Sequence, residues 1–170
     1  MIFEERILQL LEHLRNGAIV VGDYPWCHTF RETCLQEANK IYIEHILPQI
    51  ESVYRDSKTQ HYINIFEDYL KNGCFLVGLL ENETENDYEW KMDVIMYCRF
   101  CLYRACYIFC DDILGQLLYG GLVKSTQMLL NVSDLCAITQ QQLIHPNSFH
   151  NIGERIHRIH ARIGGNPPRF

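Results

Sequence analysis

The stretch YEWKMDVIMYCRFCLYRACYIFC, residues 88–110, decides how this chain folds. Placed on a helix, its apolar residues cover more than a third of the circumference, and others extend that arc almost all the way round. The charges of Asp93, Arg104 and Asp111 fall on one narrow line. A helix with so little polar surface must be buried, so Tyr88 to Cys110 is predicted to be the central helix of the molecule.

A second, mostly uncharged helical stretch, Ile113 to Leu130, follows directly. We expect it to fold back on the first, which gives a buried helical hairpin wrapped by the rest of the chain. Within it, Gly120 and Gly121 would each cost about 1 kcal/mol relative to alanine in a helix interior. The glycine pair therefore predicts either a kink or the close approach of another backbone.

The segments before the hairpin also show helical spacing and no convincing strand. The first helix is amphipathic and should stop at Asn16-Gly17. A second helix begins at Trp26 after a turn, and Pro48 should break it before a short third helix. The predicted inward stripe of the second helix is Cys27, Phe30, Cys34, Ala38, Ile41 and His45.

Further helices are expected after about Thr59, at Ser133 and at Pro146, with an acidic loop from Glu81 to Asp87 before the central helix. Asn86 or Asp87 can cap the central helix, where the helix dipole also favours negative charge. The chain, residues 1–170, is therefore predicted to be one all-α domain. It should be a bundle of about eight helices around the hairpin, with a flexible tail at the last few residues.

Composition and charge exclude several classes of protein. With a net charge of −6 the chain would be repelled by a phosphate backbone, so no nucleic-acid partner is expected, although residues 151–170 carry four arginines. No apolar run reaches the roughly 18 residues that cross a bilayer, and the start of the chain has no signal region. We therefore expect an intracellular protein without a transmembrane anchor, whose eight cysteines are reduced.

Cysteine and histidine are the candidates for metal chemistry. Cys98-x-x-Cys101 and Cys106-x-x-x-Cys110 point about 130° apart on a helix, so four thiolates cannot close around one ion. We predict buried free thiols, no metal and no cofactor. No nucleophile or phosphate-binding motif stands out, so the chain is expected not to be an enzyme. A thiol- or metal-dependent helical enzyme is the least favoured alternative.

Residues that would line an apolar groove follow the second to fourth predicted helices. An apolar stripe with helical spacing is more often core than groove. A short helix interrupted at Pro48, however, covers its neighbours incompletely, so two flanking helices can leave a trough floored by the central helix. Such a trough suits an amphipathic partner helix. The candidate groove residues are His45, Ile46, Ile50, Val53, Tyr54, Tyr62, Phe66, Tyr69, Leu70, Trp90, Lys91 and Val94.

Two short motifs and the predicted architecture resemble the Bcl family of apoptosis regulators, particularly its short viral members, with an iridovirus as the expected source. Phe30-Arg31-Glu32-Thr33-Cys34-Leu35 is similar to the family's death-helix motif, but Leu35 stands where the motif has an acid. Glu89-Trp90-Lys91-Met92 resembles a degraded Asn-Trp-Gly-Arg motif that keeps only the tryptophan. An alternative register places this motif at Asn72-Gly73-Cys74, with Gly120-Gly121 as a second glycine pair, and the choice stays open.

The resemblance implies an anti-apoptotic survival factor that sequesters the amphipathic death helix of a pro-apoptotic host protein in the groove. In the family an arginine pairs with the acid of the bound helix, and here Lys91, Arg99 or no residue takes that role. The protein would act in the host cytoplasm, with peripheral association with mitochondria left open. The alternative is a helical interaction module without a groove, whose exposed apolar surface forms a homodimer.

Overall fold

The structure is a computed structural model of the 170-residue chain. It describes residues 2–53, 57–81, 87–124, 127, 130–132, 134–135, 137, 149 and 151–167. These residues form about six helices and no strand, which confirms the all-α class for this part of the chain. The eight-helix count, the Bcl-like arrangement and the single domain stay predictions, and the expected tail falls largely outside the described residues.

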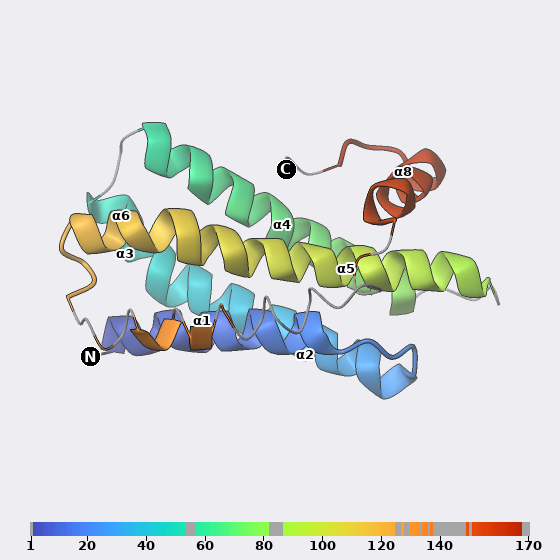
Figure 1. Cartoon of the computed structure of the whole chain (residues 1–170), viewed down its shortest axis with the longest axis horizontal. Coiled ribbons are helices and arrows are strands. Elements are labelled where there is room, and N and C mark those ends of the chain that lie inside the picture. The colour runs from blue at the N-terminus through green and yellow to red at the C-terminus, as the bar shows by residue number, and fades with distance from the viewer. Residues whose placement is uncertain are drawn as a thin grey trace.

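The helices pack in a bundle around α5 (Figure 1). α1 and α2 lie side by side, α4 runs along α5, and α8 lies over the start of α5. None of the described helices has the length and apolar character needed to cross a bilayer. The segments are α1 (Ile2–Ile19), α2 (Pro25–Ile41), the π-helical η1 (Tyr42–Ile46), α3 (Leu47–Val53), α4 (Ser57–Glu81), α5 (Tyr88–Ile108), the π-helical η2 (Phe109–Ile113), α6 (Leu114–Tyr119) and α8 (Ile152–Ile163).

α5 is the buried helix that the sequence predicts. It begins at Tyr88, because the side chain of Asp87 accepts a hydrogen bond from the backbone N–H of Trp90 at 3.0 Å and so caps the helix. α4, α1 and α8 all pack against α5. Two charged side chains, Asp93 and Arg99, are buried with its apolar residues, so each needs a polar partner inside the protein.

The predicted fold-back of Ile113 to Leu130 on the central helix is wrong. The chain continues from α5 through η2 into α6 along one line, and the antiparallel partner of α5 is α4 (Figure 1). The glycine pair ends this long helix. Gly121 has φ 84°, a left-handed conformation, and the N–H of Leu122 reaches back to the carbonyl of Leu117 at 2.9 Å.

The expected break at Pro48 is also wrong, because the path from α2 through η1 to α3 is helical throughout. Proline lacks an N–H, and its ring would clash with the carbonyl four residues earlier in a regular α-helix. The wider π-helical turn lies directly before it, where the N–H of Leu47 bonds to the carbonyl of Tyr42. We infer that this turn absorbs the clash and lets the helix continue.

α1 does not stop at Asn16-Gly17 but runs to Ile19. A Cβ added at Gly17 would lie 2.9 Å from Leu102 Cδ1 and 3.3 Å from Cys34 Cβ. The glycine therefore serves the close approach of α1 to α2 and α5, and it does not form a helix cap.

The inner face of α2 contains four residues of the predicted stripe, Cys27, Cys34, Ala38 and Ile41, whereas Phe30 and His45 are not buried. Arg31 is fully buried, whereas Phe30 is 39% exposed. The guanidinium of Arg31 donates hydrogen bonds to the carbonyls of Val20 and Gly22, both at 2.7 Å. These bonds to the α1–α2 connection hold the arginine inside and turn the phenylalanine toward solvent.

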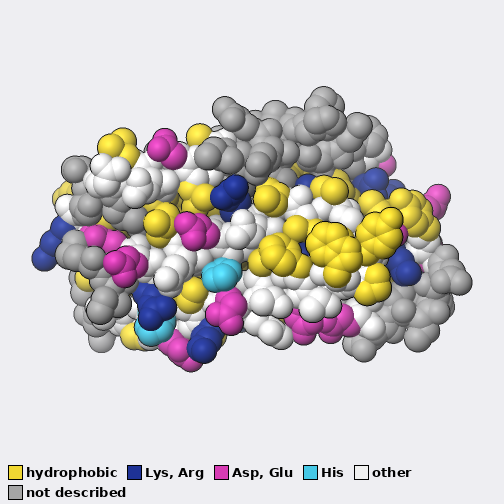
Figure 2. All heavy atoms as spheres, turned by 90° about the horizontal axis from the view of Figure 1, so that it is seen from below, with side chains coloured by type: hydrophobic (Ala, Val, Ile, Leu, Met, Phe, Trp, Pro, Cys, Tyr) yellow, Lys and Arg dark blue, Asp and Glu magenta, His cyan; other side chains and the backbone are white. Residues whose placement is uncertain are grey.

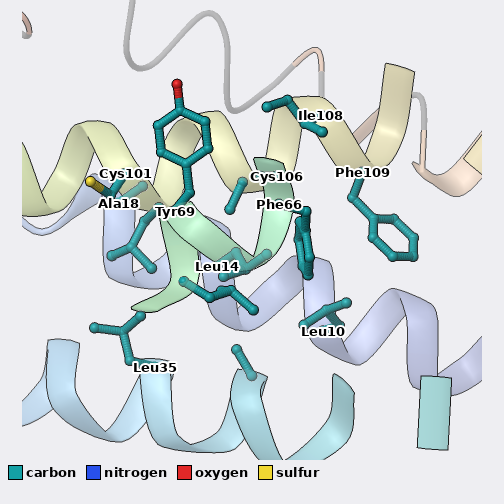
Figure 3. Close-up of a cluster of buried hydrophobic side chains, with 14 of the residues drawn as sticks. Leu10, Leu14, Ala18, Leu35, Phe66, Tyr69, Cys101, Cys106, Ile108 and Phe109 are labelled. Atoms are coloured by element: carbon teal, nitrogen blue, oxygen red, sulfur yellow. The ribbon is translucent and has the colours of Figure 1, made fainter. Parts of the chain in front are cut away.

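The hydrophobic core joins side chains from α1, α2, α4 and α5 (Figure 3). At its centre Phe66 of α4 lies between the rings of Tyr42, at 5.0 Å, and Phe109, at 5.4 Å. Tyr42 begins η1 and Phe109 begins η2, so both π-helical turns pack against the same phenylalanine.

Replacement of Leu102, which is 1% exposed, tests whether α5 is the core helix. Leu102→Ala should lower the free energy of unfolding by about 2 to 5 kcal/mol, because it leaves a cavity beside α1. Leu118→Ala, at a position that is 39% exposed, should cost less than about 1 kcal/mol. Urea unfolding of both variants gives the comparison, and equal losses would show that the core is misplaced.

Candidate functional site: the face of α5 beneath α8

α8 is an amphipathic helix that lies on the N-terminal half of α5. Its apolar face is made of isoleucines at successive turns, of which Ile156 and Ile159 are buried against the rest of the protein. The opposite face, which includes Glu154, His157 and Ala161, is exposed. Among the described segments, only α5 makes extensive contact with α8. The packing of α8 therefore depends on a single helix.

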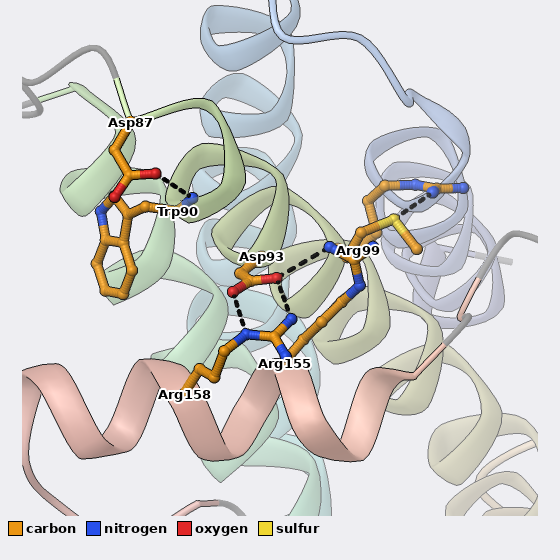
Figure 4. Close-up of polar contacts among 7 residues, drawn as sticks. Asp87, Trp90, Asp93, Arg99, Arg155 and Arg158 are labelled. Carbon is orange, nitrogen blue, oxygen red and sulfur yellow. Dashed lines mark hydrogen bonds and ion pairs between the residues drawn. The ribbon is translucent and has the colours of Figure 1, made fainter.

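A buried carboxylate on α5 holds α8 in place (Figure 4). Nε and Nη2 of Arg158 donate to the two oxygens of Asp93 at 2.9 and 2.8 Å, and Nη1 of Arg155 donates to Oδ1 at 2.9 Å. The side chain of Asp93 is only 6% exposed, while those of Arg155 and Arg158 are 23% and 53% exposed. The hydrogen bond to Asp93 raises the pKa of Arg158. This bidentate geometry favours arginine over lysine at the position.

Two further contacts join α8 to α5 on either side of this ion pair. The guanidinium of Arg162 lies 4.1 Å from the centre of the Trp90 ring and 3.6 Å from the carboxylate of Asp87. One turn after Asp93, the Tyr97 hydroxyl and Nε2 of His160 share a hydrogen bond of 2.8 Å. Burial raises the pKa of Tyr97, so its hydroxyl stays protonated.

The tautomer of His160 follows from its two partners. Nδ1 lies 3.2 Å from the carbonyl oxygen of Gly164, which can only accept a hydrogen bond. In the neutral ring Nδ1 therefore carries the hydrogen, and Nε2 accepts from the hydroxyl of Tyr97. The contact ties the C-terminal end of α8 to α5.

Open pockets flank the ion pair between α5 and α8. One has a volume of about 510 Å³, and Tyr88, Met92 and Arg155 are among its lining residues. The other has about 440 Å³ and lies beside Trp90 and Arg162. Asp93 and Arg158 line both, so the ion pair forms their common wall. The junction is consequently less completely packed than the core around Phe66.

The structure places most of the predicted groove residues in the core. Ile46, Ile50, Phe66 and Val94 are fully buried, Tyr69 and Leu70 are 1% and 2% exposed, and Trp90 is 8% exposed. His45, Tyr62 and Lys91 are partly exposed. The side chain of Val53 and the whole of Tyr54 lie outside the described residues.

The trough therefore shows no open apolar floor at these side chains. A ligand helix could reach them only if a neighbouring helix moved. Lys91, the candidate ionic anchor, lies near enough to His28 of α2 to help lower its pKa, after burial and Arg31. It thus faces α2, away from Asp93 and α8.

Sequence reasoning missed Asp93, Arg155 and Arg158 as a unit. The arginines of residues 151–170 were noted only as a basic patch, and Asp93 was one of several charges on a narrow line. Two signals point to the contact: Ile152, Ile156, Ile159 and Ile163 have the spacing of a buried helical face, and an acid within an apolar helix needs a cation.

The cysteines depart from the prediction at one position. Six described cysteines are free, but Cys110 is disulfide-bonded, so the expectation of eight reduced thiols is wrong there. In the part of the chain that the structure describes, no three histidine, cysteine or acidic side chains come together as metal ligands.

The chain matches no protein-family model, no curated protein and no solved structure. The likeness to the Bcl family accordingly rests on the motifs at Phe30 and Trp90 and on the helical architecture. Function has to be argued from the site.

Loss of the carboxylate at position 93 tests the attachment of α8. Asp93→Asn keeps the shape of the side chain but removes the charge to which Arg155 and Arg158 donate their hydrogen bonds. Charge-assisted hydrogen bonds contribute about 1.5 to 3 kcal/mol each, so the amides of α8 should exchange hydrogen at least about tenfold faster. Glu154→Gln, at an exposed acid on α8 itself, is the control. Unchanged exchange in Asp93→Asn would show that the isoleucines alone hold the helix.

The buried thiols should resist alkylation. Burial raises the pKa of Cys34 to about 11 and that of Cys98 and Cys106 to about 12, so at pH 8 they stay protonated and poorly nucleophilic. Mass spectrometry after iodoacetamide treatment should find them unmodified in the folded protein and modified in urea. Cys74, which is partly exposed, should react first. Rapid modification of Cys98 in the folded state would contradict its burial.

Proposed function

We propose that this protein captures an amphipathic helix of a pro-apoptotic host protein and acts as a survival factor without catalysing a reaction. One observation carries the proposal: the N-terminal half of α5 holds an amphipathic helix, α8, by buried isoleucines and by ion pairs to Asp93. A surface that binds one such helix has the chemistry to bind another. The resemblance to the Bcl family supplies the class of partner and implies action in the host cytoplasm or at the mitochondrial surface.

The partner helix is proposed to take the place of α8. Entry at the predicted trough would separate Phe66 from Tyr42 and Phe109, and so open the core. Among the described segments, displacement of α8 breaks extensive contacts with α5 alone, and the pockets beside it are lined by Asp93 and Trp90. Displacement of α8 therefore costs less free energy than entry at the trough, which favours this second route.

The contacts of α8 define what a ligand needs. It should present branched apolar side chains at three or four successive turns, as α8 does from Ile152 to Ile163. A basic side chain would pair with Asp93. An acid on the ligand would not reach Lys91, which faces α2.

Peptide titration tests this route. A labelled death-helix peptide, whose acid cannot use Asp93, should bind Asp93→Asn about tenfold more tightly than the unchanged protein, because α8 opens more often. A peptide with the sequence of α8 should gain less, since it loses the same carboxylate. Fluorescence anisotropy gives the affinities, and faster hydrogen exchange in α8 on binding reports its displacement.

Lys91→Ala is the matched control on the other side of α5 and should change either affinity by less than about fivefold. If neither peptide binds at micromolar concentration to folded, monomeric protein, the proposed function is wrong. If the death-helix peptide binds without exposing α8, the trough is the site.

A second candidate function, a helical assembly module, is favoured by a different observation. Large apolar side chains, among them Trp26, are exposed on α2 and on the connection before it.

A further inference from the structure

The start of α2 exposes more aromatic surface than the fold requires. Trp26 is 66% exposed, Tyr24 65%, Val21 60% and Phe30 39%. Figure 2 shows hydrophobic side chains gathered on the face that α1 and α2 form, toward the end where α2 begins. Neither the core nor the proposed helix-capture site uses them.

Two threonines complete an apolar stripe along α2. The hydroxyl of Thr29 donates to the carbonyl of Pro25 at 3.1 Å, and that of Thr33 donates to the carbonyl of Thr29 at 2.9 Å. Because their hydroxyls bond within the helix, both can present methyl groups to solvent. Trp26, Thr29, Phe30 and Thr33, which we call the α2 stripe, have the i, i+3, i+4, i+7 spacing of a helix–helix contact.

The stripe faces outward because of what lies inside. Arg31 occupies the inner position and bonds to the carbonyls of Val20 and Gly22, so α2 cannot rotate to bury Phe30 without breaking these bonds. The exposed apolar surface of the stripe with Tyr24 and Val21 is on the order of 400 Å². Patches of this size on a monomer often mark an interface.

We propose that the α2 stripe binds the α2 stripe of a second copy of this chain, with the two helices antiparallel about a twofold axis. In this register Trp26 packs over the partner's Thr33, and Phe30 over the partner's Thr29. Each large ring meets a small side chain, so the two surfaces interdigitate, and the twofold axis repeats every contact. This proposal does not rest on helix capture.

Charge favours the antiparallel pair over the parallel one. In a parallel pair Glu37, which continues the line of the stripe, would face its own copy, and the helix dipoles would be aligned. In the antiparallel register Glu37 lies across from Gly22 of the other chain. No acid then faces an acid, although the chain carries a net charge of −6.

The area suits a weak, reversible dimer. A standard interface buries about 800 Å² on each partner. The stripe with Tyr24 and Val21 supplies about half of that as an apolar centre, and the polar residues around it would form the rim. Aromatic side chains at the centre of an interface commonly dominate its affinity, so Trp26 and Phe30 should carry most of it.

Sedimentation equilibrium of the full chain over a dilution series measures the dimer. The unchanged protein should dimerise at or below about 100 μM, and Trp26→Ser and Phe30→Ser should each weaken dimerisation at least about tenfold. Tyr119→Ser is the control, because Tyr119 is 92% exposed but lies outside the stripe. Thermal midpoints close to that of the unchanged protein would show that the variants fold.

A cross-link tests the register. Trp26→Cys protein mixed with Thr33→Cys protein should give a disulfide-linked heterodimer under mild oxidation. Trp26→Cys mixed with Lys40→Cys, two turns beyond the stripe, should not. The proposal is overturned if the protein is still a monomer at 100 μM, a concentration about 7 kcal/mol short of nanomolar binding. It is also overturned if both serine variants still dimerise, or if the Thr33→Cys protein gives no cross-link.

Discussion

The fold depends on the burial of most of α5. Each charged side chain that this helix buries needs a polar partner inside the protein, because an unpaired buried charge costs several kcal/mol. Asp93 forms ion pairs with two arginines of α8, and Arg99 donates a hydrogen bond to the carbonyl of Ala18 at 2.8 Å. Each of these charges therefore ties α5 to a segment distant in the sequence. The polar residues of the central helix, rather than its apolar ones, decide where α8 and the end of α1 attach.

A pair of buried guanidinium groups fixes the connection between α1 and α2. Arg99 bonds to Ala18 at one end of this connection, and Arg31 bonds to Val20 and Gly22 at the other. Burial and, to a smaller extent, the neighbouring Arg31 together lower the pKa of Arg99 to about 10. Both groups are still charged at pH 7, and their repulsion is offset by backbone carbonyls. The rigid connection sets the rotation of α2, and with it the side chains that α2 shows to solvent.

The sequence was sufficient for what depends on local pattern. The start of α5 at Tyr88 follows from periodicity and capping chemistry, as does its cap, predicted at Asn86 or Asp87, and the structure confirms the start and places the cap at Asp87. The predicted end at Cys110 is wrong, because the helix continues through η2 into α6, and α2 begins at Pro25, one residue before the predicted start. Which helix covers which face does not follow, because an apolar stripe on α4 serves equally well against α5 or as the wall of a groove. The continuation of the helix through Pro48 was also not predicted, since a π-helical turn has no recognisable periodicity in the sequence. The bond between Asp93 and Arg158 joins residues 65 positions apart, beyond the reach of any local rule.

The two π-helical turns both pack against Phe66, in the part of the core that the predicted trough would have to open. η1 and η2 interrupt two different helices, yet each begins with an aromatic residue that contacts Phe66. A substitution of this phenylalanine would disturb the packing of both turns. It would therefore also change the alignment of α3 with α2 and of α6 with α5. Among the described residues, the polar contacts of α8 that join it to the central helix lie at Trp90, Asp93 and Tyr97, away from Phe66. This separation is the physical basis of the proposal that α8 leaves its face of α5 while the core around Phe66 stays intact.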